Sequence, residues 1–182
     1  MTTKTKPYLV IGLLTLFISL GLTAQAQNNA IKINILSPIF KTLNLSYEHK
    51  VSSTGALQLG FFYTGASSDD TSFKGIGITP EYRFYLSDTE AIEGVYIGPF
   101  VRYQNFNLSN DNSNDEGTLK TFGGGLVLGR QWVFKEKITL DTFIGPQYLS
   151  GSVDVKSGTN SFDVGIFDGF GLRAGLTFGF AF

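Results

Sequence analysis

Through almost the whole chain after residue 27, apolar residues occupy every second position and small or polar residues lie between them. The clearest case is the last stretch, where Phe178, Phe180 and Phe182 share one face and Gly179 and Ala181 share the other. Successive side chains of a β-strand point to opposite faces, so this pattern predicts strands with one apolar face. Residues 27–182 contain no apolar run long enough for a membrane helix and no sustained helical period. The chain is therefore predicted to be predominantly β.

The same alternation recurs in eight segments separated by turn-forming residues. The segments are 31–35, 43–48, 57–64, 76–84, 95–104, 122–129, 138–145 and 170–182. The connections alternate between short ones and longer ones rich in Ser, Asn, Asp and Gly; the longer ones are residues 66–73, 106–117 and 150–167. Outer-membrane barrels have short periplasmic turns and longer external loops. We therefore predict an all-β fold, an eight-stranded antiparallel transmembrane β-barrel with both termini in the periplasm.

A soluble β-sandwich or a lipocalin-like barrel is the alternative, because its strands alternate in the same way with the apolar face turned inward. The outer face of such a protein would carry Lys and Glu, whereas the polar face here is rich in glycine. Small residues suit the crowded interior of a narrow barrel. The composition therefore favours the membrane barrel over the soluble protein.

The first residues have the three parts of a secretory signal peptide. Lys4 and Lys6 give a positive start, residues 8–22 are almost continuously apolar, and Ala24 and Ala26 provide a cleavage site. A transmembrane helix would need about 20 apolar residues. We predict that residues 1–26 are removed and that residues 27–182 form the barrel domain.

Six aromatic residues fall near the predicted strand ends, where amphipathic rings settle at the level of the lipid headgroups. They are Tyr47, Tyr82, Tyr103, Trp132, Tyr148 and Phe182. We predict that they form two aromatic girdles.

Together, the export signal, the alternating segments and the closing residues 176–182 resemble the small OmpA- and OmpX-like outer-membrane barrels of Gram-negative bacteria. Residues 44–48 and 96–100 also resemble stretches of small barrel proteins of unknown function. The resemblance implies an outer-membrane location, with lipid that includes lipopolysaccharide as the surroundings. It also implies that the barrel assembly machinery reads a signal formed by Leu176, Phe178, Phe180 and Phe182.

The predicted inner face carries three charged residues of each sign. They are Glu48, Glu81, Asp141, Arg83, Arg102 and Arg173. Pairing of Leu86 with Val95 would place Glu81 diagonal to Arg102, within reach of its side chain. Buried charges need partners, so we interpret this set as a charge-balanced packing of the interior. A proton or ion path is the alternative.

The residues that carry common catalytic and metal chemistry are scarce. The chain has no cysteine, and its single histidine, His49, falls on an outward face near the periplasmic end, away from the outer leaflet. Residues 110–117 lack the glycine and glutamate positions of a calcium-binding loop, and no lysine follows the glycines at 123–125. We therefore predict no catalytic residue, no metal site and no cofactor.

The predicted role is structural or surface-interacting: a barrel that displays its external loops, with no enzymatic activity. An enzyme that modifies outer-membrane lipid and a narrow ion or proton channel are the alternatives. The formal net charge of -1, without a basic run, argues against nucleic acid as a partner. Expected partners are outer-membrane lipid, the barrel assembly machinery and an extracellular ligand at the loops. We expect a monomer.

Overall fold

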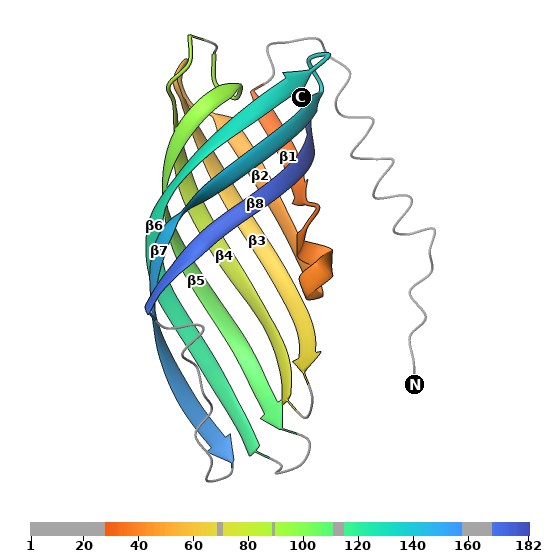
Figure 1. Cartoon of the computed structure of the whole chain (residues 1–182), viewed down its shortest axis with the longest axis vertical. Helices are drawn as coiled ribbons and strands as arrows, with labels where there is room; N and C mark the ends of the chain where they lie inside the picture. Colours follow the sequence, from red (N-terminus) through yellow and green to blue (C-terminus); the bar gives the residue numbers. More distant parts are fainter. Residues whose placement is uncertain (1–27, 69–70, 89, 111–114, 158–168) are drawn as a thin grey trace, which may run out of the picture.

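The computed structural model describes residues 28–68, 71–88, 90–110, 115–157 and 169–182. Eight antiparallel strands close into a barrel in sequence order, each paired with its neighbours and β8 paired with β1 (Figure 1). The strands are β1 (Asn29–Asn34), β2 (Thr42–Lys50), β3 (Gly55–Ser68), β4 (Thr71–Tyr85), β5 (Gly94–Asn110), β6 (Asp115–Phe134), β7 (Ile138–Ser157) and β8 (Gly169–Ala181). The predicted all-β, eight-stranded antiparallel barrel is confirmed. The predicted signal peptide, residues 1–26 with Ala24 and Ala26, lies outside the described residues.

The two ends of the barrel differ. One end, here called the turn end, carries Asn29, Phe182 and the short connections 51–54, 86–93 and 135–137, and it is uppermost in Figure 1. Two backbone hydrogen bonds of 3.0 and 2.9 Å join Asn29 and Phe182 there. The opposite end is called the hairpin end. No helix among the described residues is long and apolar enough to cross a membrane.

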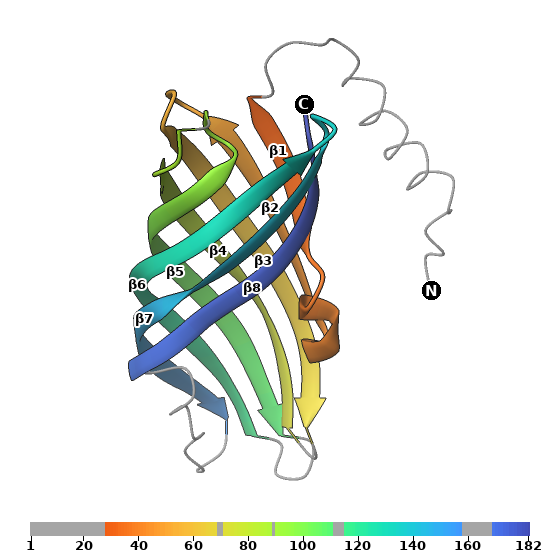
Figure 2. The same ribbon diagram turned by 45° about the horizontal axis from the view of Figure 1, so that its top comes forward.

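The strands have very unequal lengths, from six residues in β1 to 20 in β6 and β7. A short 3₁₀-helix, η1 (Ser37–Phe40), joins β1 to β2, so the chain turns back there after only the six residues of β1. Strands β3 to β7 continue well past it toward the hairpin end (Figures 1 and 2). The barrel wall therefore extends less far toward the hairpin end on the side formed by β8, β1, η1 and β2, which we call the short side.

The prediction of long loops at residues 66–73 and 106–117 is wrong for most of both ranges, because strands extend into them. The ladder between β5 and β6 continues to Asn110 and Asp115. The predicted loop 150–167 is likewise strand as far as Ser157, and residues 158–168 lie outside the described residues. Polar composition suggested loops, yet the inward positions Phe106 and Leu108 are apolar and buried, which stabilises pairing.

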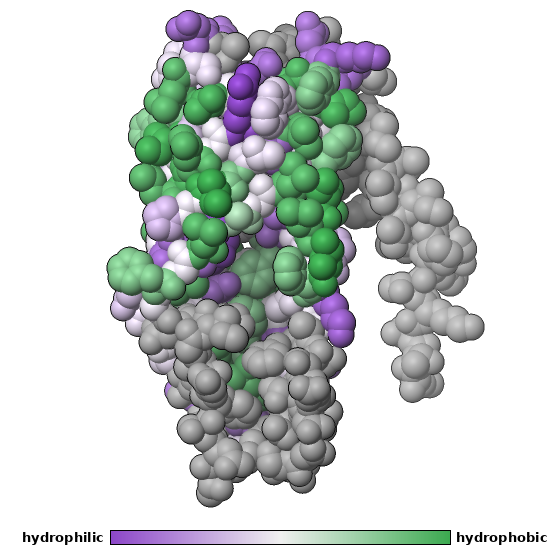
Figure 3. All heavy atoms as spheres, viewed as in Figure 1, coloured by the Kyte–Doolittle hydropathy of each residue, from purple (hydrophilic) through white to green (hydrophobic). Residues whose placement is uncertain are grey.

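The outward face of every strand carries exposed apolar side chains, and Figure 3 shows them over the turn-end part of one side. One example from each strand, in order, is Ile31, Leu45, Leu59, Ile78, Val101, Leu126, Ile144 and Phe178, with relative exposures between 39% and 53%. Toward the hairpin end this surface stops at Tyr63, Ile76, Tyr103, Phe122, Tyr148 and Phe170. We call the part of the barrel up to these residues the band.

Beyond the band, β3 to β7 form what we call the extension, and its polarity is reversed. The next outward residues are polar, among them Lys74, Asn105 and Lys120, which are exposed or half-buried. The inward residues include Phe106, Leu108 and Leu119, all buried. Alternation therefore continues along the strands while the apolar side chains change from the outside to the inside.

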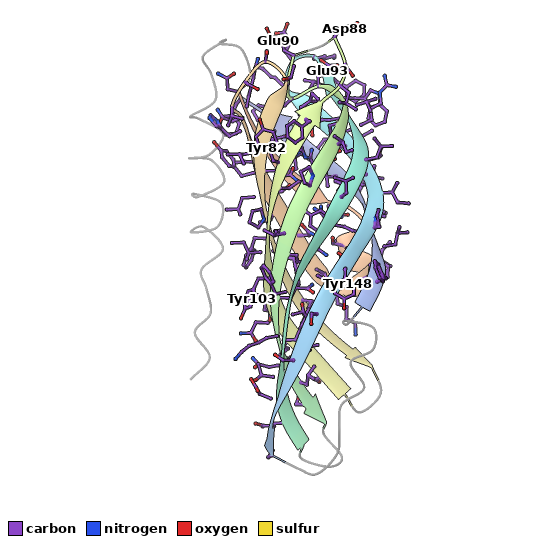
Figure 4. The ribbon with its side chains drawn as sticks, turned by 90° about the vertical axis from the view of Figure 1, so that its left-hand side faces the viewer. Tyr82, Asp88, Glu90, Glu93, Tyr103 and Tyr148 are labelled. Atoms are coloured by element: carbon purple, nitrogen blue, oxygen red, sulfur yellow. The ribbon has the colours of Figure 1, made fainter. Side chains whose placement is uncertain are left out.

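The predicted girdle aromatics lie on the outward face, exposed or half-buried. These are Tyr47, Tyr82, Tyr103, Trp132, Tyr148 and Phe182. Figure 4 shows Tyr82 toward the turn end, and Tyr103 and Tyr148 at a level closer to the hairpin end. The aromatics are thus present near both edges of the band.

Candidate functional site

The turn-end half of the interior is filled by a cluster of buried charged and polar side chains, which we call the plug. Its members are Lys32, Glu48, Arg83, Tyr85, Tyr96, Gln131 and Asp141, each no more than 3% exposed. Each comes from the inward positions of its strand, and together they represent β1, β2, β4, β5, β6 and β7. Closure of the barrel brings these residues together from distant parts of the sequence.

Two cations and two carboxylates form the centre of the plug. Lys32 Nζ lies 2.6 Å from Glu48 Oε2 and 3.6 Å from Asp141 Oδ2. Arg83 Nη1 lies 3.0 Å from Asp141 Oδ2 and 3.6 Å from Glu48 Oε1. Each carboxylate thus contacts both cations, an arrangement that offsets much of the large cost of removing four charges from water.

Neutral side chains occupy most of the remaining hydrogen-bonding positions of the plug, and Arg83 Nη2 has no hydrogen-bond partner among the described residues. Tyr85 donates its hydroxyl hydrogen to Glu48 Oε1 at 2.7 Å, and Tyr96 donates to Asp141 Oδ1 at 2.8 Å. Gln131 accepts from Lys32 at 2.7 Å and donates to Glu48 at 3.0 Å. A buried network in which nearly every group is satisfied is rigid, since moving one member leaves others unpaired.

The connection between β4 and β5 covers the plug at the turn end. Ala91 and Ile92 are 4% and 3% exposed and pack in one apolar cluster with Ala30 and Ala181. Gln131 also donates a hydrogen bond of 2.6 Å to the backbone oxygen of Ile92. Residues 91 and 92 therefore close this end of the interior.

A second group of charges continues from the plug toward the hairpin end. Glu81 accepts a hydrogen bond of 2.7 Å from Arg83 Nε, and its other oxygen pairs with Arg173 Nη1. The Arg173 guanidinium also lies over the rings of Phe100 and Phe143, 4.3 and 4.7 Å from their centroids. Cation–π contacts of this kind stabilise a guanidinium that is partly removed from water.

The predicted diagonal position of Arg102 relative to Glu81 is confirmed, but the two side chains form no ion pair among the described residues. Glu81 lies opposite Phe100, which makes Arg102 its diagonal neighbour. Both Glu81 oxygens are, however, engaged by Arg83 and Arg173. Arg102 instead donates to Thr79 Oγ1 at 3.1 Å and to Gln147 Oε1 at 3.4 Å.

The structure places all six predicted interior charges inside the barrel: Glu48, Glu81, Arg83, Asp141 and Arg173 are buried, and Arg102 is half-buried. Sequence reasoning did not include Lys32, Tyr85, Tyr96 and Gln131 among the site residues. The signal was available, because each shares the parity of an inward neighbour, as Tyr85 does with Glu81 and Arg83.

A pocket of about 430 Å³ lies on the hairpin-end side of this second group. Polar lining residues include Gln58, Thr79, Arg102 and Arg173, and apolar ones include Phe62 and Phe143. The interior thus has two parts with different chemistry, a plug of paired charges and a polar pocket.

The other predicted features take these positions. His49 is exposed at the turn end, with Nδ1 2.8 Å from Asn29 Oδ1. Gly123, Gly124 and Gly125 lie in β6, where a Cβ at Gly123 would be 2.0 Å from the Tyr148 carbonyl oxygen. Within the described ranges, no three His, Asp or Glu residues gather as metal ligands would. Of the predicted assembly signal, Leu176, Phe178 and Phe180 lie along the outward face of β8 and Phe182 directly follows the strand; the role of these residues stays a prediction.

The chain matches one family and is similar to several solved structures, two of which follow. The N-terminal β-barrel domain of Pseudomonas aeruginosa OprF has 18% sequence identity and a TM-score of 0.46, covering 87% of this chain and 100% of that one. Acinetobacter baumannii CarO has 9% identity and a TM-score of 0.44, covering 86% and 97%. No curated protein matches. Residues 12–159 match the family described as "Protein of unknown function (DUF3575)", and the chain belongs to that family.

Proposed function

We propose that the protein is an integral outer-membrane β-barrel of a Gram-negative bacterium with a structural or surface-interacting role and no enzymatic activity. The observation that carries the proposal is the band, whose exposed face is apolar on all eight strands while its interior holds the paired charges of the plug. Contiguous apolar surface of this extent is rare on soluble monomers and suits hydrocarbon. A closed barrel also pairs its backbone groups internally, as hydrocarbon requires.

The two ends of the barrel support one orientation. The short connections and both ends of the barrel domain lie at the turn end, which is the periplasmic end in outer-membrane barrels. The extension would then project beyond the outer headgroups, where its polar outward face meets water. Lys74 and Lys120, exposed just beyond the band, would lie at the level of lipopolysaccharide phosphates.

The plug favours a structural role over conduction. Its charged groups form short, mutually satisfied contacts across the interior, and Ile92 covers it at the turn end. An eight-stranded barrel of this kind has its interior filled by side chains. A narrow ion or proton channel would need this network to open.

The position of His49 argues against a lipid-modifying enzyme. Its exposed side chain lies at the turn end, beside Asn29, whereas a hydrolase of outer-leaflet lipid would need its general base near the opposite edge of the band. The surface-interacting role is assigned instead to the extension, as the part that an extracellular ligand would meet. We propose that the barrel is a monomer assembled by the barrel assembly machinery.

The test compares the electrophoretic mobility of the outer-membrane fraction before and after heating. A closed membrane barrel resists detergent until it is boiled, so we expect the full chain in this fraction to migrate differently when unheated. Recovery of the chain as a water-soluble periplasmic protein without a mobility difference would contradict the proposal. In planar bilayers we expect no conductance; discrete channel openings would instead favour the narrow channel.

A further inference from the structure

One cation of the interior has no anionic partner among the described residues. The interior cations are Lys32, Arg83, Arg102 and Arg173, and the interior carboxylates are Glu48, Glu81 and Asp141. Ion pairs join the three carboxylates to Lys32, Arg83 and Arg173. Among the described residues, the hydrogen bonds of Arg102 go to the neutral acceptors of Thr79 and Gln147, and its guanidinium lies 5.8 Å from the centroid of the Phe100 ring. The pocket that it lines therefore carries an excess positive charge.

A second polar group in the same pocket lacks a partner. Gln58 is only 5% exposed, and its Oε1 atom accepts no hydrogen bond from the part of the chain that the structure describes. It is placed near Arg102 by register, since Gln58 pairs with Glu81 across β3 and β4, and Arg102 donates to Thr79 two residues away on β4. A buried amide oxygen without a donor is costly, so the pocket is suited to a hydrated polar occupant: a water molecule held between Gln58 Oε1 and an anion on Arg102 would donate to both.

The pocket opens through the short side of the barrel wall, between η1 and β8. The ladder between β1 and β8 ends at Asn34 and Thr177, so the first half of β8 is paired to β7 alone within the described residues. The pocket lining includes Phe40 of η1 and Leu172 of β8, which are 71% and 66% exposed. Figure 1 looks onto this side, with η1 at the right and β8 crossing in front. The mouth is apolar, whereas Gln58 and Arg102 lie inside.

The mouth lies within the band, close to its hairpin-end edge. Leu172 is only two residues from Phe170, which marks that edge on β8. In the proposed orientation this is the depth of the outer leaflet. A molecule that entered from the bilayer would meet apolar side chains first and a guanidinium after them.

We propose that this pocket binds a single-chain anionic amphiphile, with its carboxylate on Arg102 and its acyl chain leaving between η1 and β8. An arginine can engage a carboxylate through two parallel N–H groups, and the surrounding low dielectric strengthens that contact. The volume of about 430 Å³ lies within the range of about 300–1,000 Å³ usual for small-molecule sites. The inference rests on the proposed function, because the acyl chain needs a lipid environment outside the mouth.

The test uses the full barrel in nanodiscs of zwitterionic lipid, with dodecanoate as the probe and calorimetry as the readout. We expect saturable binding that is at least about tenfold weaker in Arg102→Gln and largely retained in Arg102→Lys. Arg130→Gln is the matched control, because Arg130 is exposed on the outward face over the Trp132 ring and lies outside the pocket. It should bind dodecanoate like the wild type. Leu172→Glu, which places a negative charge at the exposed mouth, should also weaken binding.

Two further probes separate the contribution of the carboxylate from that of the acyl chain. Acetate, which has the same headgroup without the tail, should bind at least about tenfold more weakly than dodecanoate. Dodecyltrimethylammonium, which has the tail with the opposite charge, should not compete. Equal binding by acetate, competition by the cation, or unchanged dodecanoate affinity in Arg102→Gln would each overturn the inference.

The same preparations distinguish failure of this inference from failure of the proposed function. A chain that inserts into lipid but binds dodecanoate independently of Arg102 overturns only the pocket assignment. A chain that stays in water without lipid overturns the proposed function and, with it, the path of the acyl chain between η1 and β8.

Discussion

The outward face of β5 differs between the band and the extension, although the strand is continuous. In the band, Val101 and Tyr103 are exposed and apolar, and Gln104 is buried inside. A few residues further, Asn107 is exposed and Phe106 is buried. The period of two is the same in both regions, so the period identifies the strand. The face of the strand that carries the apolar residues, outward or inward, indicates whether lipid or water surrounds the barrel at that level.

The interiors of the two regions follow from this difference. In the band most large apolar side chains lie on the outer face, and the interior contains ion pairs such as Lys32 with Glu48. In the extension the interior is apolar, with the Phe62 and Phe106 rings 6.1 Å apart at its base. The extension is thus organised like a soluble β-sheet and the band like its inverse.

The largest predicted effect is loss of an ion-pairing group from the plug. Arg83→Met keeps much of the side-chain volume but leaves Glu48, Glu81 and Asp141 with fewer cations, and should lower the free energy of unfolding by about 3–5 kcal/mol. Denaturant unfolding in vesicles, followed by Trp132 fluorescence, measures this. The control is Lys120→Met, which removes an exposed pair with Asp154 and should cost at most about 1 kcal/mol. Equal effects of the two variants would contradict the assignment of the plug.

The next effect compares the two outward faces on one strand. Val101→Arg places a charge in the apolar part of the band and should cost about 2–3 kcal/mol in a bilayer, less than at the midplane because Tyr103, at the edge of the band, is two residues away. Asn107→Arg makes a comparable change on the same face of the extension and should stay within about 0.5 kcal/mol of the wild type. Unfolding in vesicles measures both. A tolerated Val101→Arg would mean that water, not lipid, surrounds the band.

The apolar interior of the extension gives the third prediction. Leu119, fully buried on β6, should lose about 2–3 kcal/mol of local stability when changed to Ala, because a cavity is left behind. Hydrogen exchange of the backbone amides in the β5–β6 hairpin measures local stability. Leu126→Ala, on the outward face of the same strand, is the comparison and should leave that exchange nearly unchanged. Similar exchange in both variants would remove the distinction between inside and outside in the extension.

The smallest effect concerns an ion pair in water at the turn end, where Glu90 is labelled in Figure 4. The Lys50 ammonium donates a hydrogen bond to Glu90 and holds the pKa of that carboxyl below its ordinary value. The pair therefore stabilises the fold at pH values above the ordinary pKa, and this contribution is lost as pH falls through the lowered one. Carbon NMR titration of Glu90 should show a lowered midpoint that returns toward normal in Lys50→Met. An unchanged midpoint in that variant would show that the pair does not form in solution.

Much of the fold was predictable because strand parity is local. Alternation around Glu81 and Arg83 was enough to place both inside the barrel. The partner of Glu81 was not predictable, because Arg173 is 92 residues away and reaches it only through closure of the barrel. The extension was mistaken for loops because its outward residues are as polar as loop residues. The pocket depends on the unequal lengths of β1 and β7, which a period of two does not specify.

The most direct test of the membrane account is a spin-label scan along the outward positions of β5. The chain has no cysteine, so a single introduced cysteine labels one site. Labels at 97, 101 and 103 should be accessible to oxygen, which dissolves in lipid, and protected from a water-soluble nickel chelate. Labels at 105 and 107 should show the reverse. Nickel accessibility at all five positions would contradict the claim that the band lies in a bilayer.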